Sequence, residues 1–306
     1  MKIVFAGTTH HAASVLRHLS QSMHEVVAVI TREDAPVGRK SVLTPSPVAV
    51  LASELGFPLV KTNRPGDAEN QQLETFAPDL GVVIAYGALL KAATLNIPKH
   101  GWLNLHYSLL PKWRGAAPVQ HAILNGDRET GVTIFKLDEG MDTGNIVSQV
   151  ETEIQPRENT EDLLERLTNL GISLLDETLA KIDGGIAQYR EQTGESTQAG
   201  KLSRLEAKID WNTSCHGIDQ LVRAMNPEPI AWSTSGNDSI RIIDAQASTL
   251  TRAIPVGHAF LESNRAYISC GGGTVLELLQ VQPAGKTRMN AVDWLRGQNS
   301  EVVLGG

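Results

Sequence analysis

The feature that most constrains the fold is the alternation of short apolar runs with helix-like stretches in the first half of the chain. The apolar runs have strand length: KIVFA (2–6), EVVAVI (25–30), DLGVVIA (79–85) and GWLNLH (101–106). Amphipathic stretches at 12–21, 47–55 and 69–76 stand between them. Near-continuous apolar strands that alternate with helices are typical of a parallel sheet covered on both faces. The pattern therefore predicts a doubly wound α/β domain.

Two further patterns complete this domain. The runs GVTIFKL (131–137) and IVSQVETEI (146–154) alternate in polarity and predict a β-ribbon at the edge of the sheet. Apolar residues then recur with helical period from 160 to 182, which predicts a long helix lying on the core, with Thr160 as its cap. The catalytic domain is expected to span residues 1–185.

The rest of the chain has a different character. Residues 186–207 are rich in Gly, Gln, Thr and charge, and they are predicted to be a linker. In residues 208–306, one helix near 214–225 precedes short strands separated by Gly, Pro and Asn turns. Those strands are expected near 231–235, 239–247, 255–261, 266–270 and 274–281. This spacing predicts a second domain, a small β-barrel or sandwich.

Charge and cysteine content limit the partners and the compartment. The net charge of −7 is spread over the chain, so a polyanionic partner would need a local group of cations rather than a general field. The two cysteines, Cys215 and Cys270, fit a reducing cytoplasm. No apolar run approaches the length of a membrane span, so we expect a cytoplasmic protein without a membrane partner.

The first turn after a strand argues against a nicotinamide enzyme. A dinucleotide fold favours G-x-G-x-x-G at this point, but residues 6–10 read AGTTH and hold one glycine. His10 and His11 follow without a carboxylate or cysteine at metal-ligand spacing, so we interpret them as loop residues and expect no metal.

Polar residues that suit acyl transfer cluster in the middle of the chain. Asn104 and His106 end a predicted strand and share one face of it, where doubly wound sheets bind ligands. Asp142 stands between Gly140 and Gly144, which permit a close approach to another loop. Each feature alone also fits a satisfied polar pair or an ordinary turn. Together they predict that Asn104 and a protonated His106 stabilise an oxyanion, that Asp142 keeps the imidazole charged, and that a substrate amine attacks directly.

Residues 104–144, NLHYSLLPKWRGAAPVQHAILNGDRETGVTIFKLDEGMDTG, resemble the signature of the formyltetrahydrofolate-dependent transformylases. Within it, the segment WRGAAP (113–118) resembles the form found in the members of this family that act on methionyl-tRNA. Further similar segments occur in order: KIVFAGT, APVGRKSVLTPSPV, VVIAYGALL, KLSRLEAKIDW, RAMNPEPIAW and LQVQPAGKTRM. The resemblance implies a Rossmann-like catalytic domain, a linker and an OB-like barrel. It also implies formyl transfer from 10-formyltetrahydrofolate, the co-substrate, to the α-amino group of methionine on initiator tRNA.

The resemblance also implies roles for individual residues. Asn104, His106 and Asp142 match the family's catalytic trio. The residues that match its folate-binding segments are Ser108, Leu109, Leu110, Pro111, Tyr86 and Gly87. Arg39 matches an arginine of an inserted loop that contacts the acceptor stem, and Lys40 beside it is a second candidate for tRNA contact. The family implies no metal, and we expect a monomer.

The chain departs from the family pattern near the expected pocket and in the inserted loop. Tyr107 stands where the family has Gly, and Thr9 and His11 stand where it has Pro and Phe. Ser41 and Val42 make the inserted loop less basic than usual. Two alternatives remain: a sister transformylase acting on a small amine, or an inactive RNA-binding relative. The inserted loop, the barrel and the complete trio favour the enzyme that acts on tRNA.

Overall fold

The computed structural model describes residues 1–38 and 40–305, which form two compact units. Unit 1 contains residues 1–118, 129–153 and 164–199, and unit 2 contains 119–128, 154–163 and 200–306. Each is described by itself below. The domain boundaries predicted above, at 185/186 and 207/208, stay a proposal.

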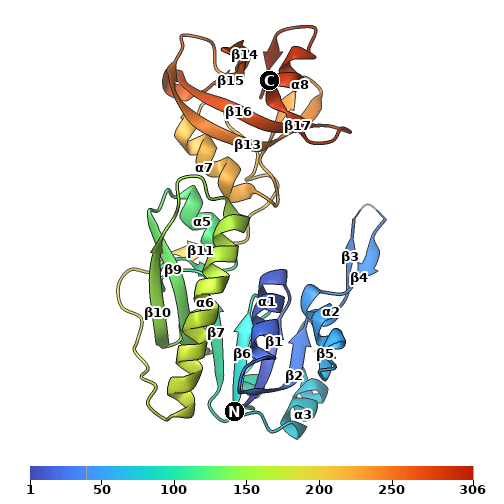
Figure 1. Cartoon of the computed structure of the whole chain (residues 1–306), viewed down its shortest axis with the longest axis vertical. Helices are drawn as coiled ribbons and strands as arrows, with labels where there is room; N and C mark the ends of the chain where they lie inside the picture. Colours follow the sequence, from blue (N-terminus) through green and yellow to red (C-terminus); the bar gives the residue numbers. More distant parts are fainter. Residues whose placement is uncertain (39, 306) are drawn as a thin grey trace. The chain divides into compact units, whose positions relative to one another are not determined.

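Unit 1 is built on a seven-stranded sheet (Figure 1) with the order β10-β9-β7-β6-β1-β2-β5. Its strands are β1 (Lys2–Gly7), β2 (Glu25–Thr31), β5 (Leu59–Lys61), β6 (Leu80–Ile84), β7 (Trp102–His106), β9 (Glu129–Lys136) and β10 (Ile146–Glu153). The five strands from β7 to β5 pair in parallel, whereas β9 and β10 are antiparallel and form one edge. The doubly wound α/β fold and the edge ribbon are therefore confirmed.

The strand order reverses direction at the centre of this sheet. From β1 the chain adds β2 and β5 on one side, and then returns to add β6 and β7 on the other. The connections that leave β1 and β6 therefore diverge at the carboxyl ends of these strands. Doubly wound folds bind their ligands at such a point, because the diverging loops leave a crevice.

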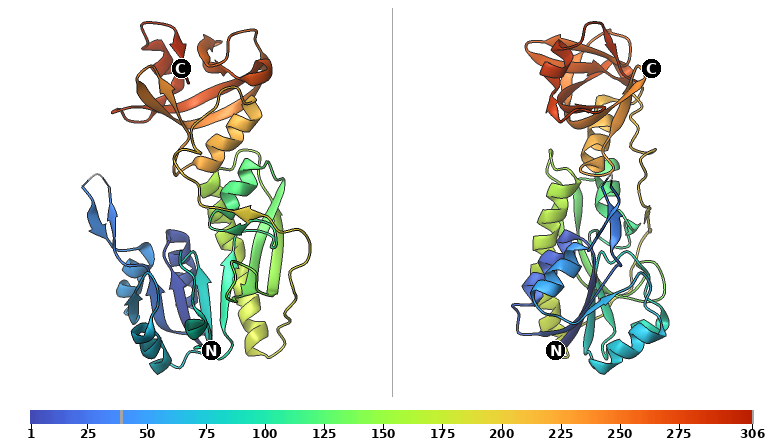
Figure 2. Two further views of the ribbon diagram at one scale, coloured as in Figure 1. Left: turned by 180° about the vertical axis from the view of Figure 1, so that it is seen from behind. Right: turned by 90° about the vertical axis from the view of Figure 1, so that its right-hand side faces the viewer.

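Helices cover both faces of the sheet (Figure 2). On one side are α1 (His10–Leu19), α2 (Pro47–Glu54) and α6 (Thr160–Asp183), and on the other are α3 (Asp67–Thr75) and α4 (Ala92–Leu95). Apolar residues of α1 are fully buried, as its helical periodicity predicts. None of the helices in the described residues combines the length and the apolar character that crossing a bilayer requires.

The start of α6 corrects one detail of the sequence analysis. Asn159, not Thr160, caps the helix, because its Oδ1 accepts hydrogen bonds from the backbone nitrogens of Glu161 and Asp162 at 2.8 and 3.1 Å. Thr160 is the first helical residue, and its hydroxyl donates to the carbonyl oxygen of Ala224 at 2.7 Å. Asn and Thr both cap helices well, so composition alone left the choice of residue open.

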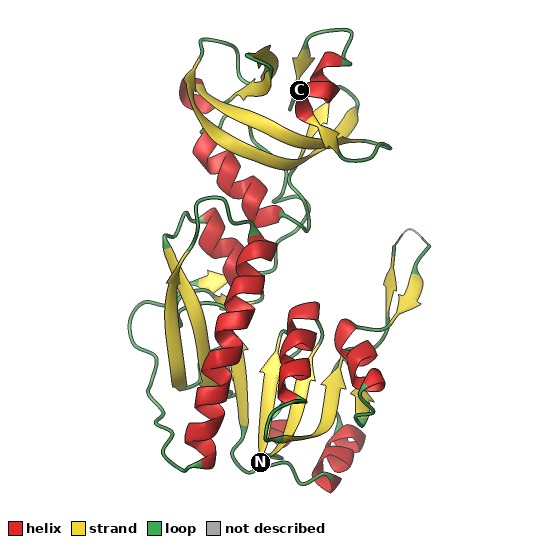
Figure 3. Ribbon diagram, viewed as in Figure 1, coloured by secondary structure: helices red, strands yellow, loops and turns green. Residues whose placement is uncertain are grey.

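Two short pairings were not predicted. β3 (Ala35–Val37) and β4 (Val42–Thr44) form an antiparallel ribbon outside the main sheet (Figure 3), and all six residues are exposed. β8 (Arg114–Gly115) pairs with β11 (Gln198–Ala199), so part of the segment predicted to be a linker packs on unit 1.

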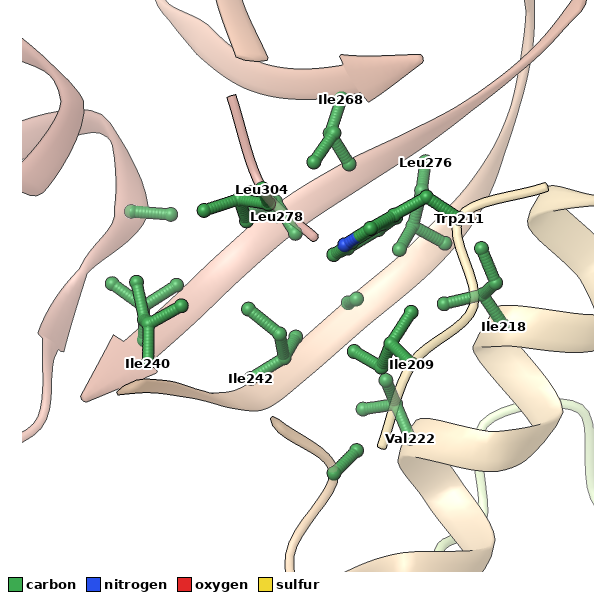
Figure 4. Close-up of a cluster of buried hydrophobic side chains, with 14 of the residues drawn as sticks. Ile209, Trp211, Ile218, Val222, Ile240, Ile242, Ile268, Leu276, Leu278 and Leu304 are labelled. Atoms are coloured by element: carbon green, nitrogen blue, oxygen red, sulfur yellow. The ribbon is translucent and has the colours of Figure 1, made fainter. Parts of the chain in front are cut away.

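Unit 2 contains helices and an antiparallel barrel. Its helices include α5 (Pro118–Leu124), whose first residue belongs to unit 1, α7 (Cys215–Met225) and α8 (Ala291–Arg296). The barrel strands are β12 (Trp232–Ser235), β13 (Asp238–Thr251), β14 (His258–Glu262), β15 (Arg265–Ser269), β16 (Thr274–Pro283), β17 (Met289–Asn290) and β18 (Val302–Val303). A bridge between Ser235 and Leu304 nearly closes the strand order. Trp211 lies among the aliphatic side chains of the barrel core (Figure 4), and its Nε1 donates to Ser233 Oγ at 2.9 Å. The C-terminal barrel is confirmed.

The contact between Gly81 and Trp102 predicts a stability effect. These residues face each other on β6 and β7, and a β-carbon at Gly81 would lie 2.1 Å from Cδ2 of the fully buried Trp102. We expect Gly81→Ala to lower the free energy of unfolding by about 1–3 kcal/mol, because the core must shift to accept the methyl group. Gly200→Ala, where the added β-carbon meets open space, is the control. Urea unfolding measures both, and an unchanged midpoint in Gly81→Ala would contradict the prediction.

Candidate active site

A pocket of about 510 Å³ opens where the strand order of unit 1 reverses. Its walls come from the turn after β1, the segment 85–90 after β6, the end of β7 and the loop between β9 and β10. Most of the lining is apolar. The polar side chains that line it are Thr9, Tyr86, Asn104, His106, Tyr107, Asp138 and Asp142. An apolar cavity with a few convergent polar groups is the usual form of a small-molecule site.

The structure brings the three predicted catalytic residues together in this pocket. Asn104 and His106 extend from the same face of β7, two residues apart, as the strand period requires. Asp142 reaches them from the loop between β9 and β10, and its Oδ2 lies 3.8 Å from His106 Nδ1. Residues separated by nearly forty positions in the chain thus share one site.

His106 is held in a defined tautomer. Its Nε2 lies 2.9 Å from the carbonyl oxygen of Trp113, and because a carbonyl only accepts, Nε2 carries the proton. Burial lowers the pKa of His106, and the Asp142 carboxylate and the hydrogen bond to Trp113 offset this effect only in part. The lowered pKa favours a neutral imidazole with an unprotonated Nδ1, whereas the sequence predicts a protonated ring.

The backbone fixes the Asp142 carboxylate. Asp142 has a φ of 54°, in the left-handed region, and its Oδ2 accepts a hydrogen bond from the Gly115 nitrogen at 2.7 Å. Gly144, two residues later, passes so close to the Lys136 carbonyl oxygen that an added β-carbon would lie 1.8 Å from it. The glycine that follows the predicted acid is therefore needed for the close approach of the loop.

Tyr86 and Gly87, predicted to contact folate, line the pocket. The Tyr86 hydroxyl donates to the Thr62 carbonyl oxygen at 2.7 Å, and burial raises the pKa of Tyr86 to about 12. Arg32 Nη1 donates to the Gly87 carbonyl oxygen at 2.6 Å. These two bonds hold the wall of the pocket from the neighbouring loops.

The other predicted folate segment lies outside the lining of this pocket. That segment is Ser108, Leu109, Leu110 and Pro111. Ser108 is fully buried, and its hydroxyl donates to the Lys112 carbonyl oxygen at 2.5 Å. Leu110 packs against Phe135 in a small apolar cluster. Its contact with folate stays a prediction.

Tyr107, the residue that departs from the family pattern, is 7% exposed. Its hydroxyl lies 3.0 Å from Thr168 Oγ1 on α6, and burial raises the pKa of Tyr107 to about 12. The larger side chain thus joins the end of β7 to the helix that covers it.

The two predicted tRNA contacts, Arg39 and Lys40, fall between β3 and β4 in the sequence. Arg39 lies outside the described residues. Lys40 is exposed in the turn that precedes β4. Their role stays a prediction.

Comparison with known proteins decides the family. The model for "Formyl transferase" matches residues 1–179, and the model for "Formyl transferase, C-terminal domain" matches residues 201–299. The chain belongs to the formyl transferase family. A methionyl-tRNA formyltransferase of Corynebacterium diphtheriae is 44% identical over 311 residues, which cover 99% of each chain. One of Leifsonia xyli is 42% identical over 304 residues, covering 99% of this chain and 100% of the relative.

A solved structure shows the same fold at low identity. It is a sugar 3N-formyl transferase determined in the presence of dTDP and 5-N-formyl-THF, with a TM-score of 0.69 and 22% identity. The match covers 94% of this chain and 99% of the other. The two proteins thus share a fold despite their low sequence identity.

The groups that hold the predicted catalytic residues give no signal in the sequence. The Trp113 carbonyl and the Gly115 nitrogen are backbone atoms, for which side-chain patterns give no signal. Both residues do lie in the WRGAAP segment on which the resemblance rests. Gln192, which contacts the Asp142 loop, stands in a polar stretch without any pattern.

The electrostatics of His106 lead to a prediction. We expect the His106 ring to titrate below the ordinary value of about 6.5. Asp142→Asn should lower the His106 pKa further, because the negative carboxylate favours the imidazolium. NMR titration of the ring, assigned with His106→Gln, measures both. Asp138→Asn, which removes the other carboxylate of the lining, should leave the His106 midpoint nearly unchanged. A His106 pKa that rises in Asp142→Asn would contradict the analysis.

Proposed function

We propose that this protein transfers the formyl group of 10-formyltetrahydrofolate to the α-amino group of methionine on initiator tRNA. The observation that carries the proposal is the convergence of Asn104, His106 and Asp142 in one pocket, in a chain that resembles methionyl-tRNA formyltransferases over nearly its full length. An amide donor, a neutral imidazole and a carboxylate suit transfer of an acyl group to an amine.

The pocket suits the formyl donor. Its volume and its apolar walls, which include Leu89, Leu90 and Leu137, suit a flat aromatic ligand, and Asn104 and His106 add polar groups from β7. Tyr86 and Gly87 would contact the folate through the wall formed by 85–90. The solved sugar formyl transferase was determined with a formylated folate, which supports the choice of co-substrate. The proposal requires no metal.

In the proposed mechanism, the neutral methionyl amine attacks the formyl carbon. The carbon–nitrogen bond forms as the carbonyl oxygen becomes an oxyanion, to which the Asn104 side-chain amide donates. His106 Nδ1 accepts the proton that the amine loses, since Nε2 is occupied by the Trp113 carbonyl. The imidazolium then returns this proton to the leaving folate nitrogen as its bond to the formyl carbon breaks.

Asp142 has its effect during this proton transfer. At 3.8 Å, its carboxylate is too far from Nδ1 for a hydrogen bond but close enough for electrostatic attraction. The attraction is large only while His106 is charged. Asp142 therefore stabilises the transient imidazolium, and this contribution favours the transition state over the resting enzyme.

The tRNA contacts in the proposal depend on placed cations. The net charge of −7 gives no general attraction to RNA, so Arg39 and Lys40 would supply local contacts to the acceptor stem. The barrel of residues 208–306 would contact the tRNA as a second domain, joined to the catalytic domain 1–185 by the segment 186–207. We further propose that the enzyme is a cytoplasmic monomer.

A substrate comparison tests the function. The full chain is incubated with 10-formyltetrahydrofolate and, in separate reactions, methionyl initiator tRNA, methionyl elongator tRNA or a nucleotide-linked amino sugar. We expect formylmethionine to form fastest on initiator tRNA. Faster transfer to the amino sugar would favour the sister-transformylase alternative, and tRNA binding without any transfer would favour an inactive relative.

Asn104 gives a prediction specific to the chemistry. We expect Asn104→Ala to lower kcat by about 100- to 1,000-fold, the usual cost of losing one oxyanion donor. The KM for folate should change little, because the bond strengthens mainly in the transition state. Asn169→Ala, on the exposed side of α6, is the control. A large rise in folate KM with an unchanged kcat would show that Asn104 binds the co-substrate instead.

A further inference from the structure

Gln192 connects two segments beside the candidate catalytic residues, the loop that carries Asp142 and residues 113–115. Its Nε2 donates to the carbonyl oxygens of Asp142 and Gly144, at 2.8 and 2.9 Å. Its Oε1 accepts from Arg114 Nη2 and Nε, at 2.6 and 3.1 Å. The side-chain amide of Gln192 is half-buried. Its NH2 group bonds to the loop that carries Asp142, and its oxygen bonds to Arg114.

The second of these segments holds the other catalytic partner. Trp113 accepts the hydrogen bond from His106 Nε2, and the nitrogen of Gly115 donates to the Asp142 carboxylate. Arg114 lies between them and is the residue that Gln192 binds. Gln192 therefore joins the segment that orients His106 to the segment that carries Asp142.

Asp142 needs such a restraint because of its backbone conformation. A non-glycine residue in the left-handed region costs free energy and persists only where the surroundings fix it. The carboxylate is fixed by Gly115, and the carbonyl oxygen of the same residue is fixed by Gln192. Without the second bond, the loop can turn toward an ordinary conformation and draw the carboxylate away from His106.

We propose that Gln192 is a positioning residue of the active site, which acts by holding Asp142 at its distance from His106. This inference rests on the proposed function, since it assigns a role in that same site. Gln192 does not line the pocket and touches no reacting atom. The charged groups near His106 are Asp142, Asp138 in the pocket lining, and Arg114 beside Trp113.

Two variants, Gln192→Ala and Gln192→Met, remove the hydrogen bonds, and the second keeps most of the side-chain volume. We expect kcat to fall about 10- to 100-fold, since small displacements of catalytic groups have effects of this size. The folate KM should stay nearly constant. The acid limb of the pH–kcat profile should move to lower pH, because a more distant carboxylate raises the His106 pKa less. Gln188→Ala, exposed in the same segment, is the control.

A double variant separates positioning from a general structural role. If Gln192 acts through Asp142, then Gln192→Met should cost little further activity in an Asp142→Asn background. An additive loss, or a lower kcat with an unshifted pH profile, would overturn the proposal.

NMR titration of His106 tests the inference without turnover. In Gln192→Met, the His106 pKa should fall below that of the wild type, toward the value in Asp142→Asn. An unchanged His106 pKa would overturn the inference. If the wild-type protein formylates no amine, the proposed function fails, while this titration still decides the role of Gln192.

Discussion

The reversal of strand order between β1 and β6 is the constraint on which the site depends. It separates the loops after these strands and leaves space at their carboxyl ends, and β7 beside β6 then brings Asn104 and His106 to that space. Trp102, Asn104 and His106 occupy one face of β7 because the side-chain period of a strand is two. Trp102 is buried against Gly81 and donates to the Thr94 carbonyl oxygen, so the same packing that stabilises the sheet also directs the next two residues into the pocket.

Within the pocket, two opposing electrostatic effects act on His106. Burial disfavours the imidazolium, and the Asp142 carboxylate favours it, but burial has the larger effect and lowers the pKa. A ring that was permanently charged could not accept a proton from an attacking amine. A neutral ring beside a fixed carboxylate can accept the proton and is stabilised once it has done so. The distance of 3.8 Å suits this role, because a direct hydrogen bond would hold a proton on Nδ1 and favour the charged form in the resting enzyme.

Sequence patterns predicted the parts of this structure that repeat with a regular period. The strands β1, β2, β6 and β7 followed from their apolar runs, and the edge ribbon and α6 followed from apolar periodicity, whereas β5 was not predicted. The barrel followed from the spacing of its short strands and turns, and the polar pattern and the resemblance both indicated Asn104, His106 and Asp142. The parts that depend on tertiary contacts did not follow. The pairing of Gln198–Ala199 with Arg114–Gly115 uses backbone hydrogen bonds between segments over eighty residues apart, which composition does not encode. The lowered pKa of His106 likewise results from burial, which a motif of polar residues does not reveal.

Backbone conformation around the site points to preorganisation. Ala85, Trp113 and Asp142 all have positive φ, and each such residue costs on the order of 1–3 kcal/mol. Hydrogen bonds from distant segments hold two of them. Thr197 Oγ1 accepts from the Trp113 nitrogen at 2.8 Å, and Gln192 binds the Asp142 carbonyl oxygen. Both contacts come from residues 190–199, which sequence composition marked as a linker. These hydrogen bonds form during folding, so in the proposed mechanism the catalytic groups need little rearrangement when charge develops. Fixed dipoles stabilise a transition state most under this condition. The polar segment after α6 therefore helps to fix the backbone around the candidate site, although it does not line the pocket.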